Sequence, residues 1–164
     1  MFEIAILTIF PAAVAFAGAI DLFTMTIPNR VSLALFVAFL VFAPLAGLGA
    51  HDMLWHLAAG VAVLTIGILL FIPGWIGGGD AKLVAAVALW LGFDHLLAFL
   101  VFTALAGGAL SLLFVAVRAY PLPAFALRQP WALRLHDRRT GIPYGIALAA
   151  GALLVYPHTT WFTG

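Results

Sequence analysis

The chain has 164 residues, of which 66% are hydrophobic and 8% are charged, with a formal charge of +1 and no cysteine. A soluble domain carries about 25% charged residues, so this composition excludes an ordinary soluble domain and predicts that most of the chain lies in lipid. The absence of cysteine excludes disulfides, cysteine-ligated zinc and thiol nucleophiles. About 20 apolar residues cross a bilayer core, which leaves room for roughly six crossings and for no sizeable soluble domain.

Six apolar runs predict an all-α, polytopic membrane protein that forms one domain over residues 1–164. In chain order the runs cover residues 4–22, 31–48, 54–72, 80–93, 96–117 and 142–160. No basic residues precede the first run, and it is longer than a typical signal-peptide core, so we expect a retained helix. The long polar stretch 118–141 is rich in proline and arginine and is predicted to be a loop that lies on anionic lipid.

The seven basic residues indicate the orientation in the membrane. They lie after the first run, after the third run and between the fifth and sixth runs, namely Arg30, Lys82, Arg118, Arg128, Arg134, Arg138 and Arg139. Lys and Arg are retained on the cytoplasmic side of a membrane. The pattern therefore predicts that the basic loops are cytoplasmic and that both termini lie on the opposite side.

Two acidic residues, Asp21 and Asp80, do not fit the pattern of loop charges. Counting about 1.5 Å per residue places Asp21 near the inner edge of the bilayer core and Asp80 roughly 9 Å inside it. A charged residue at this depth is costly and indicates a function. Each also has a structural alternative, because Asp80 could cap the helix after three glycines and Asp21 could be solvated by lipid headgroups. Their shared depth and face favour a functional pair.

Paired carboxylates offer a specific chemistry. Two like charges in a poorly solvated site do not both ionise easily, so the pair shares a proton. One carboxylate then activates water while the other donates a proton, as in aspartic proteases. The glycines before Asp80 allow a peptide or another helix to approach the backbone closely.

Several short motifs along the chain resemble those of a known family. They are, in chain order, Asp21 followed by Ile27-Pro28-Asn29, then Gly77-Gly78-Gly79-Asp80 with Lys82, which reads as G-x-G-D-x-K, and finally Pro143-Tyr144-Gly145. The set resembles the type IV prepilin peptidases, and in particular the short members found in tight-adherence (Flp-type) pilus systems. The resemblance covers most of the chain.

The resemblance implies a bacterial inner-membrane aspartic endopeptidase that cleaves the leader of prepilins at the cytoplasmic face for pilus biogenesis. It implies Asp21 and Asp80 as the catalytic pair, and a supporting set of Gly77, Gly79, Lys82, Pro28 and Asn29. The implied partners are membrane lipid and a prepilin with a basic leader and a hydrophobic helix, with no nucleic acid, cofactor or metal. Long members of the family methylate the new N-terminus and carry a Cys-x-x-Cys insertion, which this chain lacks.

The residues argue against other protease classes. Presenilin-type proteases share G-x-G-D but need Tyr-Asp and Pro-Ala-Leu, whereas Ile20 precedes Asp21 here. The zinc motif His-Glu-x-x-His and the Gly-x-Ser-x-Gly elbow are absent. A proton-coupled transporter or channel component that uses the two carboxylates as a relay, and a non-catalytic pilus assembly scaffold, are the alternative functions.

For most of the remaining polar and small residues the sequence predicts structural roles. Lys82 either acts on the carboxylate pair or a substrate carbonyl, or is a snorkelling anchor. Pro28 and Asn29 are predicted to stop the first helix and turn the chain. We expect helix contacts at the small-x-x-x-small pairs Ala104/Gly108 and Gly141/Gly145. The polar residues expected at the outer interface, rather than as metal ligands, include His51, Asp52, His56 and His95.

Overall fold

The computed structural model describes residues 2–123 and 126–163, and within these ranges the chain forms helices and no strand. The predicted all-α membrane fold class is therefore confirmed. Residues 1, 124, 125 and 164 of the predicted domain, two of them in the predicted loop, lie outside the described residues. The helices are α1 (Phe2–Thr24), α2 (Asn29–Leu45), α3 (Ala50–Phe71), α4 (Gly78–Val117), α5 (Pro130–His136), α6 (Gly145–Val155) and α7 (Thr160–Thr163), with 3₁₀ turns η1 (Ala126–Arg128) and η2 (Tyr156–His158).

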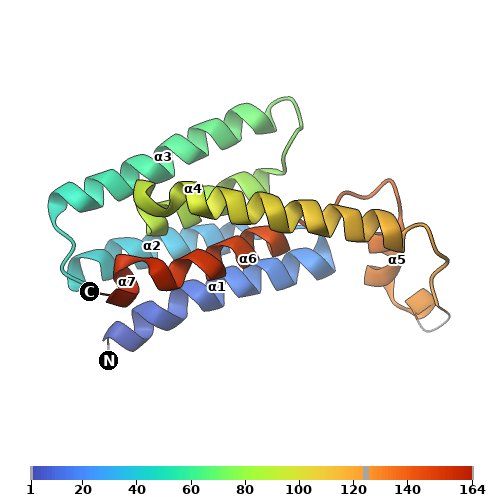
Figure 1. Ribbon diagram of the computed structural model, residues 1–164, viewed down its shortest axis with the longest axis horizontal. Helices are drawn as coiled ribbons and strands as arrows, with labels where there is room; N and C mark the ends of the chain where they lie inside the picture. The colour runs from blue at the N-terminus through green and yellow to red at the C-terminus, as the bar shows by residue number, and fades with distance from the viewer. Residues whose placement is uncertain (1, 124–125, 164) are drawn as a thin grey trace.

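Helix α4 supplies two of the segments that run along the bundle. Its 40 residues would span about 60 Å if straight, twice the thickness of a bilayer core. The backbone breaks at Gly92, where φ is 66° and ψ is −178°, and Figure 1 shows the second half of α4 running back along the first. The described residues thus form six apolar segments: α1, α2, α3, the two halves of α4, and α6.

Length and composition support a membrane environment. Among the described residues, three helices are long and apolar enough to cross a membrane, namely residues 5–24 of α1, all of α3, and α4. Helix α2 and the stretch 145–158 are shorter apolar helices. The second half of α4 leaves most of its large side chains exposed, as expected of a segment whose solvent is lipid.

Side chains from neighbouring helices satisfy backbone carbonyls at the reversal of α4. The last carbonyls of a helix lack partners within it, and unpaired polar groups are costly in a membrane. The His56 ring donates from Nδ1 to the Leu89 carbonyl at 2.8 Å, and Trp161 Nε1 donates to the Trp90 carbonyl at 2.7 Å. The C-terminal segment therefore helps to hold the outer turn of α4 in place.

We expect the substitution Gly92→Ala to destabilise the protein, because φ of +66° is strained for a residue with a Cβ. The new Cβ would also lie 3.0 Å from the His56 ring. Strain of this kind costs about 1–3 kcal/mol, which a lower unfolding temperature in detergent would report. Gly108→Ala is the matched control, since a Cβ there meets nothing within 4 Å and alanine is a better helix former. Equal unfolding temperatures for the two variants would contradict the prediction.

The first half of α4 is the centre of the bundle. Its buried residues include Ala81, Leu83 and the continuous stretch 85–92, and α4 packs against α2, α3 and α6. Trp90 lies beside the Phe10 ring of α1 and donates a hydrogen bond from Nε1 to the Leu35 carbonyl of α2 at 2.9 Å. This packing fixes the position of α4 along the bundle axis relative to α1 and α2.

The two ends of the bundle differ in charge. Figure 1 shows both termini at one end and α5 at the other. Because α2 and α4 begin at the α5 end and α4 also finishes there, all seven basic residues lie at or beyond that end. Asp52 and Asp94 lie at the end that carries the termini.

The stretch 118–141 is more ordered than the predicted loop, since it contains η1 and α5. The Trp131 ring packs edge-on against Phe23 near the end of α1, and Arg134 donates to the Phe23 carbonyl at 3.3 Å. Arg118 donates to the carbonyls of Leu135 and Gly141, at 2.8 and 2.9 Å. Two of the predicted surface arginines therefore tie this segment to the bundle.

Candidate active site

Asp21 is a buried carboxylate held by a backbone N–H at the start of α6. It lies one turn before the end of α1 and is only 5% exposed. The backbone N–H of Gly145, the first residue of α6, donates to Asp21 Oδ2 at 2.8 Å. The N-terminus of a helix carries a partial positive charge that stabilises a nearby anion. Asp21 thus supplies the acceptor at the start of α6 that no side chain of α6 itself provides.

Asp80 is a partly buried carboxylate in the first turn of α4. The helix begins at Gly78 with Gly77 as its N-cap, so Asp80 is the third helical residue rather than the N-cap. Its carboxylate accepts a hydrogen bond from the backbone N–H of Gly77, which is the reciprocal half of a capping box. The alternative that Asp80 is the N-cap of this helix is therefore wrong, although its carboxylate does bond to the N-cap residue and stays within range of the Asp21 charge.

The fold brings the two carboxylates together although 59 positions separate them in the sequence. They are close enough for the charge of Asp21 to act on Asp80. Each lies at the N-terminal end of a helix, Asp21 against α6 and Asp80 within α4. Two neighbouring carboxylates, with one backbone donor each and one of them partly exposed, can hold a water molecule and exchange its proton.

The glycines of the predicted motif allow close packing around this pair. A Cβ at Gly77 would lie 2.8 Å from Asp80 Oδ2, and a Cβ at Gly79 would lie 3.1 Å from the Ile27 side chain. Gly79 thus brings the start of α4 against the turn that follows α1. A residue with a side chain at either position would displace the carboxylate or the turn.

Pro28, Asn29 and Lys82 lie beside the pair rather than within it. Helix α1 already ends at Thr24, and Met25 takes the left-handed conformation with φ of 57°. Pro28 is the N-cap of α2 and Asn29 its first residue, so the prediction that they stop the first helix is wrong by one short turn. Lys82 Nζ donates to Asn29 Oδ1 at 2.9 Å, which joins α4 to α2 next to the carboxylates.

The Lys82–Asn29 hydrogen bond is exposed, so we expect the variants Lys82→Met and Asn29→Ala to have small effects. An exposed pair of this kind contributes about 0.5–1 kcal/mol, and a double-mutant cycle of unfolding temperatures measures it. We expect the rate of a reaction carried by the carboxylate pair to fall by less than about tenfold in either single variant. A loss as large as that of an Asp21 variant would instead assign Lys82 to the chemistry.

The predicted small-residue contacts are only partly correct. A Cβ at Gly108 or Gly141 would meet nothing within 4 Å, so these residues are not contact points. A Cβ at Gly107 would lie 3.1 Å from the Tyr144 ring, and one at Gly145 would lie 2.8 Å from the Asp21 Cβ. Sequence reasoning missed the role of Gly145 as a backbone donor, and the signal available for it was its place in the Pro-Tyr-Gly motif.

A family model described as the type IV leader peptidase family matches residues 8–112. This match includes Asp21, Asp80 and the glycines between α3 and α4. The chain belongs to the type IV leader peptidase family. The motif Pro143-Tyr144-Gly145 lies outside the matched residues.

The curated relatives of this chain include a longer bacterial protein. The prepilin leader peptidase/N-methyltransferase of Bacillus subtilis (strain 168) is 31% identical over 159 residues. The match covers 92% of this chain and 56% of the relative, so the chain spans little more than half the length of the curated protein that it matches. No solved structure gives a significant match.

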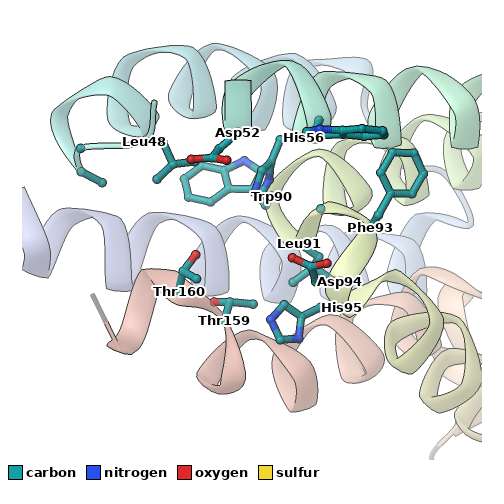
Figure 2. Close-up of a pocket in the computed structure, with 14 residues that line it drawn as sticks. Leu48, Asp52, His56, Trp90, Leu91, Phe93, Asp94, His95, Thr159 and Thr160 are labelled. Atoms are coloured by element: carbon teal, nitrogen blue, oxygen red, sulfur yellow. The ribbon is translucent and has the colours of Figure 1, made fainter. Parts of the chain in front are cut away.

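A cavity of about 700 Å³ lies at the end of the bundle opposite the carboxylate pair. Figure 2 shows it between α3 and the reversal of α4, with Asp52, His56, Asp94 and His95 among its lining residues. His56 is bonded to the Leu89 carbonyl, and the described residues hold no group of three or more candidate metal ligands. This cavity lies far along the bundle from the carboxylate pair and contributes no residue to it.

Proposed function

We propose that this chain is an aspartic endopeptidase that removes the leader peptide of prepilins at the cytoplasmic face of a bacterial inner membrane. The observation that carries the proposal is that the Asp21 and Asp80 carboxylates lie at one end of the bundle, close enough to interact electrostatically. Family membership supports the reaction class, and the name of the Bacillus subtilis relative supports the substrate class.

The proposed reaction uses a water molecule held between the two carboxylates. One carboxylate takes a proton from the water as its oxygen attacks the scissile carbonyl carbon and the C–O bond forms. The other carboxylic acid gives a proton to the amide nitrogen as the C–N bond breaks. The products are the free leader acid and the new amino terminus of the pilin, and the pair ends with the same number of protons.

The charges at the two ends of the bundle support the proposed orientation. All seven basic residues lie at the α5 end with the carboxylate pair, and basic segments stay in the cytoplasm. Both termini then lie in the periplasm. The substrate helix would lie in the membrane beside the bundle while its leader reaches Asp21 and Asp80 from the cytoplasm.

The proposal is tested by coexpressing the full chain with a prepilin from the same genome. We expect a faster-migrating pilin on a gel, and the mass of its new N-terminal peptide should define a single cut. The same mass reports N-methylation, the second activity in the name of the relative. An unprocessed prepilin beside a folded and membrane-inserted enzyme would contradict the proposal.

The alternative functions have their own signatures. Proton flux into liposomes that contain the purified chain, without cleavage of any prepilin, would favour a transporter. Pilus assembly that is fully supported by the double variant Asp21→Asn/Asp80→Asn would favour a scaffold. No residue contact described above favours either alternative over cleavage.

A further inference from the structure

A second site lies on the side of the bundle that faces lipid. Helices α2 and α3 each pack on the first half of α4 but make little contact with one another. The groove between them has a volume of about 510 Å³. Its walls are apolar, with Leu33 on α2 and Val61 on α3, and its floor is formed by Ala85 and Leu89 of α4.

The groove has one polar end. Asn29, Arg30 and Lys82 lie there, at the end of the bundle that carries the basic residues. Two cationic side chains above an apolar groove match a molecule with an anionic head and a long apolar tail. Basic side chains at the membrane surface attract anionic lipid, and the apolar walls can hold an acyl chain that the head group anchors.

The dimensions of the groove favour an acyl chain over a helix. Its lining on α4 runs from Lys82 to Leu89, a length of about 10 Å. That length is about two helical turns, a third of the length of a transmembrane helix. A transmembrane helix would only partly enter, while extended acyl chains fit between the walls. The basic end would also repel the basic leader of a prepilin.

We propose that the α2–α3 groove is a binding site for an anionic phospholipid. The phosphate contacts Arg30 and Lys82, Asn29 offers its amide to the head group, and an acyl chain lies against Leu33, Val61 and Leu89. The site does not depend on the proposed peptidase activity. It places one lipid beside α4, within two residues of Asp80.

The test is native mass spectrometry of the purified full chain after incubation with phosphatidylglycerol or phosphatidylcholine that carry identical acyl chains. We expect one molecule of phosphatidylglycerol to be retained in clear preference to phosphatidylcholine. Arg30→Gln should reduce this preference by about fivefold, because each basic side chain near anionic lipid contributes about that factor. Equal retention of the two lipids by the wild-type chain would overturn the proposal.

Filling the groove should displace the lipid. Val61→Trp and Leu33→Trp each place an indole in the groove from opposite walls, and each should weaken phosphatidylglycerol binding by at least tenfold. Leu69→Trp is the matched control, because Leu69 lies on α3 outside the groove and has the same exposed fraction as Val61, 62%. Undiminished binding in both groove variants, or an equal loss in the control, would contradict the site. Binding of an apolar helical peptide that Val61→Trp abolishes, without any preference for phosphatidylglycerol, would assign the groove to a substrate helix instead.

Discussion

Replacing either carboxylate, with Asp21→Asn or Asp80→Asn, should reduce prepilin cleavage by about 10²–10⁴-fold, the range that general acid–base groups contribute. Asparagine keeps the shape and an acceptor oxygen, so the hydrogen bond from the Gly145 N–H to position 21 can remain. What is lost is the ability to take and return a proton. The measurement is the initial rate of leader removal in membranes that contain equal amounts of each variant.

The control for this experiment is Asp94→Asn. Asp94 is also acidic and lies in α4, but it is exposed at the opposite end of the bundle. Its substitution should leave the rate unchanged within about twofold. If either Asp21→Asn or Asp80→Asn cleaves at the wild-type rate while inserted normally, the two carboxylates do not carry the reaction.

The second large effect is expected from Gly145→Ala. A Cβ at this position would lie 2.8 Å from the Asp21 Cβ and 2.9 Å from its Oδ2, so either α6 or the carboxylate must shift. Overpacking of this kind costs about 1–3 kcal/mol, and a displacement of about 1 Å in a catalytic group lowers a rate by about 10²-fold. We expect both a lower unfolding temperature and a rate reduced by about two orders of magnitude.

Gly141→Ala separates this effect from a general intolerance of alanine in the same segment. Gly141 precedes α6 by four residues, and a Cβ there meets nothing within 4 Å. Its rate and its unfolding temperature should match those of the wild type. A normal rate in Gly145→Ala would show that Asp21 does not need the backbone position of α6.

The sequence predicted the fold class, which the structure confirms, and it singled out the two acids as candidates, because both inferences follow from the cost of charge in lipid. Asp21 and Asp80 interrupt apolar runs at a similar depth, and that coincidence is visible without any structure. The meeting of the two side chains also needs the packing of α1, α4 and α6, which hydropathy does not encode. The roles that depend on backbone groups were therefore missed, above all that of the Gly145 N–H.

The predicted helix boundaries differ from the observed ones at two places where the local backbone conformation turns the chain. The polar residues Asp94 and His95 marked the division between the fourth and fifth runs, whereas the chain turns at Gly92, inside the fourth. Similarly, Pro28 was expected to end the first helix, whereas Met25 ends it through a left-handed conformation that its side chain does not announce. At Gly92 the apolar pattern continues through the turn, so periodicity carries no signal there.

The reversal of α4 at Gly92 has a consequence for how the protein is made. The half of α4 before Gly92 has about 14 residues and a length of about 21 Å, too short to span the bilayer core alone. It carries both Asp80 and Lys82, and neighbouring helices rather than lipid cover most of its surface. During biosynthesis this segment therefore does not insert stably into the bilayer by itself. It must insert together with the longer neighbouring helices. The first half of α4, and with it Asp80, is therefore positioned only when those helices have assembled.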